Sequence, residues 1–132
     1  MIVADTNLIV YLFITGDQTP LAQKVLDKDP YWIVHPLWQS EFRNVLAAYI
    51  RRGMTDQVAK QIMQNALLTL ENRQVIPSDD EIFNSIARSN CTAYDCEFVA
   101  LARQLNVFLV TADKQLLKEF PDCTISLEEF VK

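Results

Sequence analysis

Met1-Ile2-Val3-Ala4-Asp5-Thr6-Asn7 opens the chain and passes from an apolar run to an acid, a hydroxyl and an amide. The run 1–4 predicts a strand of a parallel sheet, because such a strand is covered on both faces and is continuously hydrophobic. Asp5 would stand at the carboxyl end of that strand, where a helix can begin at Thr6 or Asn7. Open α/β sheets bind ligands at that edge, so Asp5 is either a helix cap or part of a site.

Beyond this start, strand and helix patterns alternate along the chain. Further strands are expected at 31–35, 73–76, 107–111 and 123–126. Helices are expected at 8–13, 19–28, 37–52, 55–70, 78–88, 92–105 and 112–120, with a terminal turn or helix at 127–131. Such alternation predicts a parallel sheet with right-handed crossovers. We therefore expect a single α/β sandwich domain over residues 1–132, without internal repeat or linker.

The composition is that of an ordered globular protein with reduced cysteines. Half of the 132 residues are hydrophobic and only two are glycine, which excludes a low-complexity chain. No apolar run approaches the roughly 20 residues of a membrane helix, and the start lacks the basic region of a signal peptide. The three cysteines form no C-x-x-C pair, and there is one histidine. We therefore expect a cytoplasmic protein without a structural zinc site.

The net charge of −5, taken alone, argues against a nucleic acid as partner. Phosphate binding usually shows as a basic surplus in the sequence. A divalent cation gathered by several acids reverses the local sign of the charge, however. The net charge therefore does not decide the partner.

Four acids stand at predicted junctions or helix starts. Asp5 ends the first strand, and Asp113 follows the strongest of the later strands. Glu41 lies in the first turns of one predicted helix, and Asp95 lies near the start of another. Strand ends and the helix starts after them share one edge of a parallel sheet, where four carboxylates repel one another unless they bind protons or a cation. Oxygen ligands without His or Cys indicate Mg²⁺ or Mn²⁺.

Each acid also has a structural interpretation. Asp5, Asp95 and Asp113 are typical helix caps when considered one at a time, and Glu41 could be a solvated helix residue. A metal site is therefore predicted only because all four acids are expected at the same edge of the sheet. His35 is isolated in the sequence, and we expect it to be a structural residue at a strand end.

Four motifs, taken in order, resemble the signature of the PIN domain family, in particular of its VapC-like toxins from toxin–antitoxin pairs. The motifs are Asp5-Thr6-Asn7, Glu41 with Asn44, Tyr94-Asp95 followed by Val99-Ala100-Leu101-Ala102, and Thr111-Ala112-Asp113. The resemblance covers nearly the whole chain. It implies a three-layer α/β/α fold with a central parallel sheet. It also implies a metal-dependent ribonuclease that is commonly dimeric and is held inactive by a co-encoded antitoxin.

The same resemblance implies roles for individual residues. Asp5, Glu41 and Asp95 would be the main ligands of Mg²⁺ or Mn²⁺, and Asp113 would complete the site directly or through water. Three polar residues would support these ligands: Thr6, Asn44 and Thr111. The expected substrate is RNA, cut at its phosphodiester bonds.

Arg43 and Lys114 are candidate contacts to RNA phosphates.

Two alternatives to a ribonuclease remain. One is a PIN-like module that binds RNA or protein with little catalysis. Another is a phospho-acceptor receiver domain, which typically pairs two adjacent acids after its first strand, whereas Asp5 is followed by Thr6 and Asn7.

Overall fold

Four short parallel strands form the centre of the computed structural model, which describes residues 1–132. They are β1 (Ile2–Ala4), β2 (Trp32–Ile33), β3 (Leu109–Val110) and β4 (Thr124–Ile125). The strands pair in the order β2-β1-β3-β4, and every pairing is parallel. All three residues of β1 are buried, as expected for a central strand that is covered on both faces.

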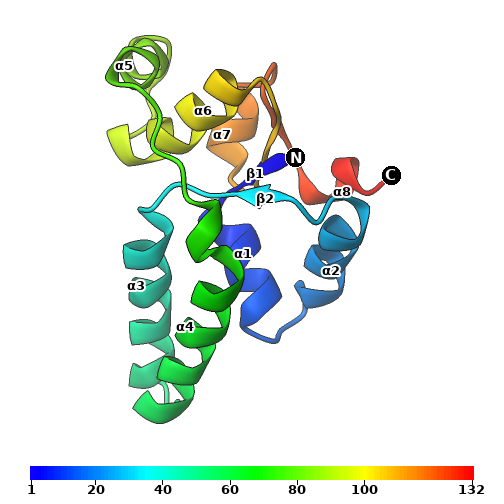
Figure 1. Cartoon of the computed structure of the whole chain (residues 1–132), viewed down its shortest axis with the longest axis vertical. Coiled ribbons are helices and arrows are strands. Elements are labelled where there is room, and N and C mark those ends of the chain that lie inside the picture. The colour runs from blue at the N-terminus through cyan, green and yellow to red at the C-terminus, as the bar shows by residue number, and fades with distance from the viewer.

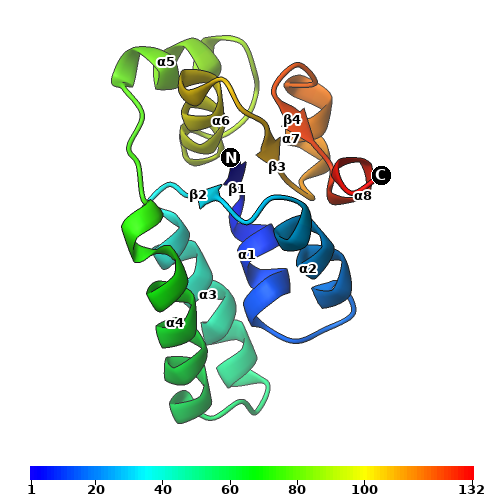
Figure 2. The ribbon, with the colours of Figure 1, turned by 45° about the vertical axis from the view of Figure 1, so that its right-hand side comes forward.

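Helices cover both faces of this sheet. They are α1 (Thr6–Phe13), α2 (Thr19–Lys28), α3 (Trp38–Arg51), α4 (Asp56–Leu70), α5 (Asp79–Ala87), α6 (Ala93–Leu105), α7 (Lys114–Glu119) and α8 (Leu127–Phe130), with a 3₁₀ turn η1 (Glu71–Arg73). Figure 1 and Figure 2 show α1 to α4 on one side of the sheet, with α8 beside α2, and α5, α6 and α7 on the other side. The predicted three-layer α/β/α architecture is confirmed.

Burial of helix stripes fixes the layers. The stripe of α3 is formed by Trp38, Phe42 and Leu46, which are buried at intervals of four residues, the spacing of one helix face. Helix α6 lies between α5 and the strands β1 and β3, and residues 98–102 are all buried. The start of α6, which carries Asp95, is therefore held against the sheet by a continuous core. No helix is both long and apolar enough to span a membrane.

The structure differs from the sequence prediction in the segment 73–76. We expected a strand there, but Gln74 forms only one isolated parallel bridge with Val34. The 3₁₀ turn that follows α4 continues to Arg73, and Pro77 comes soon after. The next hydrogen bonds of this parallel ladder would come from the N–H groups of residues 36 and 77, but both are prolines and have none.

Gly53, in the turn between α3 and α4, generates a prediction about stability. Its φ of 116° favours glycine, and an added Cβ would meet no atom within 4 Å. Gly53→Ala should therefore lower the free energy of unfolding through backbone strain alone, by about 1–3 kcal/mol. Urea denaturation at neutral pH measures the change.

Gly16→Ala is the matched control. Its Cβ would lie 3.9 Å from the carbonyl oxygen of Ile14, an ordinary contact, and Gly16 has no positive φ. We expect no loss of stability, because alanine restricts the unfolded chain. An equal loss in both variants would contradict the assignment of the effect to backbone strain at Gly53.

Candidate active site

A cleft of about 370 Å³ opens where β1 and β3 end. All four predicted acids line it: Asp5, Glu41, Asp95 and Asp113. They come from the end of β1, the first turn of α3, the first turn of α6 and the start of α7. The chain leaves β1 toward β2 on one side, while β3 lies on the other. The cleft therefore occupies a switch point of the sheet, where open α/β folds bind ligands.

Asp5 is held by three hydrogen bonds at the end of β1. Its Oδ1 accepts the backbone N–H of Thr6 at 2.8 Å and so caps α1. Its Oδ2 accepts the hydroxyl of Thr111 at 2.6 Å and the side-chain amide of Asn7 at 3.2 Å. The side chain is buried, with 7% of the residue exposed. Asp5 therefore caps a helix and lines the cleft at the same time.

The segment after β3 is tied to Asp5 through Thr111 and Asn7. The Thr111 hydroxyl accepts the backbone N–H of Asp113 at 2.9 Å, and Asn7 Oδ1 accepts that of Ala112 at 3.1 Å. Asp113 in turn caps α7 with Oδ1, which accepts the N–H groups of residues 115 and 116. The second oxygen, Oδ2, has no hydrogen bond within the protein. Capping therefore engages only one of the two carboxylate oxygens of Asp113.

Glu41 and Asp95 enter the cleft from two different helices. The hydroxyl of Thr6 donates to Glu41 Oε1 at 2.5 Å, which links α1 to α3. Asp95 is not the cap of α6, because its own backbone N–H donates to the hydroxyl of Thr92 at 3.1 Å. The side chain of Asp95 is therefore free of the capping role that sequence reasoning left open for it.

The four carboxylates lie close enough to affect one another's ionisation. Burial raises the pKa of Asp5 to about 6. The charges of Glu41 and Asp95 also raise this pKa, whereas the hydrogen bonds from Thr111 and Thr6 lower it. Burial also raises the pKa of Glu41 and of Asp95, and the nearby charges of Asp95 and Asp113, respectively, add to the rise. No three of these side chains are arranged as a ready-made metal site. The cleft therefore gathers four carboxylates with no basic side chain in its lining to offset their charge.

The remaining predicted residues fall partly inside the cleft. Asn44 lines it, whereas Arg43 and Lys114 are exposed outside it, with Arg43 Nη2 donating to Gln39 at 3.3 Å. Sequence reasoning gave no site role to four residues of the lining: Asn7, Val10, Tyr11 and Val45. Tyr11 lies four residues after Asn7 and Val45 four after Glu41, so helical spacing from the motifs was the available signal.

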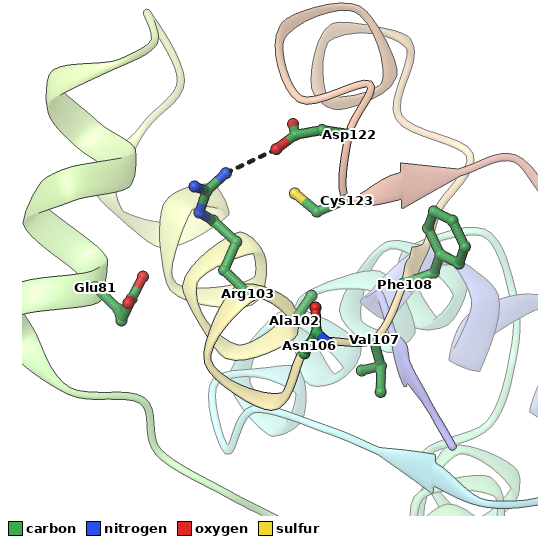
Figure 3. A pocket seen from close by; sticks show the side chains of 8 residues that line it. All are labelled: Glu81, Ala102, Arg103, Asn106, Val107, Phe108, Asp122 and Cys123. Carbon is green, nitrogen blue, oxygen red and sulfur yellow. Dashed lines mark hydrogen bonds and ion pairs between the residues drawn. The ribbon is translucent and has the colours of Figure 1, made fainter.

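A second hollow, of about 350 Å³, lies at the opposite end of the strands (Figure 3). Val107 and Phe108 precede β3, and Cys123 precedes β4. Its main charged groups, Arg103 and Asp122, pair with each other at 3.1 Å. This pairing leaves one acid, Glu81, in the hollow, against four acids in the cleft, so the cleft is the better candidate site.

The raised pKa of Asp5 predicts how metal-free protein responds to pH. Between the ordinary value of 3.8 and about 6, the folded state holds a proton that the unfolded chain releases. Its stabilising contribution is therefore full below about pH 3.8 and is lost as the pH rises through about 6. Asp5→Asn should remove this loss of stability, because the amide stays neutral and can still cap α1. In chelator at pH 7 the Tm of the variant should therefore be the same as the wild-type Tm or a few degrees higher.

Thermal unfolding of both proteins in chelator, from pH 4 to pH 8, tests this prediction. The advantage of Asp5→Asn should shrink toward pH 4. A Tm several degrees below that of the wild type at pH 7 would instead mean that Asp5 serves mainly as a structural hydrogen-bond partner.

Comparisons with known proteins agree with this geometry. A match to the PIN domain family covers residues 2–121. Ribonuclease VapC3 of Pyrobaculum aerophilum is 25% identical over 124 residues, which cover 91% of this chain and 95% of that protein. The crystal structure of PAE2754 from Pyrobaculum aerophilum has the same fold, with a TM-score of 0.76 at 20% identity over 98% of this chain and 92% of that one. Because the family match spans most of the chain, the protein belongs to the PIN domain family.

Proposed function

We propose that this protein is a VapC-like, metal-dependent endoribonuclease that hydrolyses RNA phosphodiester bonds. The observation that carries the proposal is the meeting of four carboxylates, from four separate elements, in one open cleft of a PIN domain. Three of the four have raised pKa values because they are buried near one another. Such a cluster is costly unless it serves to bind a cation.

The donor set of the cleft fits Mg²⁺ or Mn²⁺. Its acidic ligands are all carboxylates, and neither His nor Cys lines the cleft, which is the chemistry of hard divalent cations. Asp5, Glu41 and Asp95 would hold the ion, and Asp113 would complete the site directly or through water. When bound, one or two such ions would supply activation of water and neutralisation of charge on the phosphate.

The protein's own residues would orient the ligands and receive the RNA. Thr111 and Thr6 fix the carboxylates of Asp5 and Glu41 through their hydroxyls, as partners of metal ligands commonly do. Asn44 and Tyr11 line the cleft and would contact the nucleotide next to the scissile bond. Hydrolysis by water would leave a 5′-phosphate and a 3′-hydroxyl.

The proposed partners follow from the same assignment. Arg43 and Lys114 are exposed on elements that also carry Glu41 and Asp113, and they would contact RNA phosphates on the way into the cleft. The similarity to Ribonuclease VapC3 supports a toxin–antitoxin setting. We therefore propose a cytoplasmic homodimer that a cognate antitoxin protein keeps inactive.

One observation favours a second candidate function, a PIN domain that binds RNA or protein with little catalysis. No group of three or more His, Cys, Asp or Glu side chains is arranged to hold a metal ion. Membership of the PIN family argues against the receiver-like alternative. Cleavage and metal binding, measured side by side, separate the two remaining candidates.

Purified protein should cut mixed cellular RNA in Mg²⁺ or Mn²⁺ and not in chelator. Asp5→Asn, Glu41→Gln and Asp95→Asn should each lose more than the roughly 10–100-fold in rate that removal of a supporting partner costs. Thr111→Val, which removes the hydroxyl bound to Asp5, should fall within that range. End-labelled RNA and mapping of the 5′ ends measure both the rates and the expected 5′-phosphates.

Glu128→Gln is the matched control, because Glu128 is an exposed acid on α8, outside the cleft. It should cut at the wild-type rate. Absence of cleavage by wild-type protein that binds Mn²⁺ and is free of antitoxin would favour the binding role. Cleavage that survives chelator and Asp5→Asn would mean a contaminating nuclease or a different site.

A further inference from the structure

The helix pair α3 and α4 carries a net positive charge in an otherwise acidic protein. The two helices lie side by side and run away from the sheet (Figure 1). Residues 38–70 hold four basic side chains and two acids, whereas the rest of the chain holds eight basic side chains and fifteen acids. Acids are therefore scarce on the same helix pair that contributes Glu41 to the cleft.

Two of these four basic side chains, Arg51 and Arg52, are exposed where α3 ends. Neither guanidinium forms a hydrogen bond or an ion pair within the protein. The other two basic groups have partners, because Lys60 pairs with Asp56 at 3.6 Å and Arg43 donates to a glutamine one turn earlier at 3.3 Å. Arg51 and Arg52 are therefore the two charges of the helix pair that are free to bind a ligand.

Both arginines lie on the face of α3 that lines the cleft. Asn44 and Val45 are part of the cleft lining. Arg51 follows Asn44 by seven residues, and Arg52 follows Val45 by seven, a spacing of about two turns that returns to the same helix face. The separation along the helix axis is roughly 10 Å, which matches about three nucleotides of a stacked strand at roughly 3.4 Å each.

The helix surface between the cleft and these arginines is open. Ala48 lies on the same face, four residues after Asn44 and three before Arg51, and it is exposed. Its methyl group is too short to obstruct a strand that passes along the helix. A nucleic-acid strand that leaves the cleft on this side would bring its phosphates to guanidinium groups, whose N–H donors match phosphate oxygens in geometry and charge.

We propose that Arg51 and Arg52 bind backbone phosphates of the RNA about three nucleotides from the scissile bond, so that the substrate lies along α3. This inference rests on the proposed function, because it assumes that RNA enters the cleft. A basic residue in the last turn of a helix can instead stabilise the negative end of the helix dipole. That role would change the stability of the protein and not the salt dependence of RNA binding.

Binding of fluorescein-labelled oligouridylate in chelator, followed by anisotropy over a series of KCl concentrations, tests the proposal without relying on cleavage. The probe must be long enough to reach from the cleft to the end of α3. Arg51→Gln and Arg52→Gln should each weaken binding roughly 2–5-fold at low salt. Each phosphate contact of a single strand contributes about 0.7 to the slope of log K against log salt concentration, so the double variant should have a slope smaller by roughly 1.4.

Lys24→Gln is the matched control for each single variant. Lys24 is exposed on α2, which lies on the other side of α1 from α3 (Figure 1). Its substitution removes one positive charge away from the proposed path and should leave affinity and slope unchanged. Arg51→Lys combined with Arg52→Lys keeps both charges and should retain the wild-type slope, since counterion release depends on charge.

Cleavage in Mg²⁺ tests whether these contacts belong to the same RNA path as the cleft. The double glutamine variant should raise KM and keep kcat near the wild-type value, because a contact made equally in the ground state and the transition state affects binding alone. An unchanged KM beside weakened oligouridylate binding would mean that the arginines bind RNA outside the productive path, and would contradict the proposal.

Each contradictory binding result has a distinct meaning. Wild-type affinity and slope in the double variant, beside cleavage by wild-type protein, would overturn this inference, leave the proposed function standing and favour an acidic protein as the partner of these arginines. A lower Tm with an unchanged slope would assign them to the helix dipole. An equal loss in Lys24→Gln would assign the effect to net charge. Wild-type protein that binds no RNA would contradict both this inference and the proposed function.

Discussion

The buried carboxylate of Asp5 is the constraint on which the rest of the site depends. One of its oxygens caps the N-terminus of α1, and the other accepts a hydrogen bond from the hydroxyl of Thr111 at 2.6 Å. The bond to Thr111 joins the ends of β1 and β3. Burial raises its pKa to about 6, so ionised Asp5 at neutral pH is poorly compensated. The negative charges of Glu41 and Asp95 disfavour the ionised form of Asp5 further. A cation in the cleft would relieve it.

Capping and site formation are carried out by the same side chains. Asp5 and Asp113 each start a helix, yet both face the cleft. A cap engages only part of a carboxylate, and Oδ2 of Asp113 has no partner in the protein. Thr6 donates its backbone N–H to Asp5 and its hydroxyl to Glu41, so it fixes the two carboxylates relative to each other. Helix capping thus holds two of the four acids, Asp5 and Asp113, while Thr6 holds Glu41 and the first turn of α6 carries Asp95.

The sequence was informative where short-range rules decide structure. The buried first strand, the caps at Asp5 and Asp113, and the parallel α/β layout follow from local pattern and are present. The strand expected at 73–76 is reduced to a single bridge, because Pro36 and Pro77 have no N–H to extend its pairing with Val34. The meeting of the four acids was expected from the rule that strand ends share one edge. His35 and Glu97 could not be paired from sequence, since only the packing of the segment after β2 against α6 brings them together.

The most direct test of the central claim is NMR line broadening of backbone amides by substoichiometric Mn²⁺. If the four acids form the cation site, broadening should be strongest around residues 5–7, 41, 95 and 111–113 and should disappear on addition of excess Mg²⁺. Broadening centred on the hollow near Glu81 and Asp122, or spread evenly over the acidic surface, would contradict the claim. In that case the convergence of the carboxylates in the cleft would have another purpose.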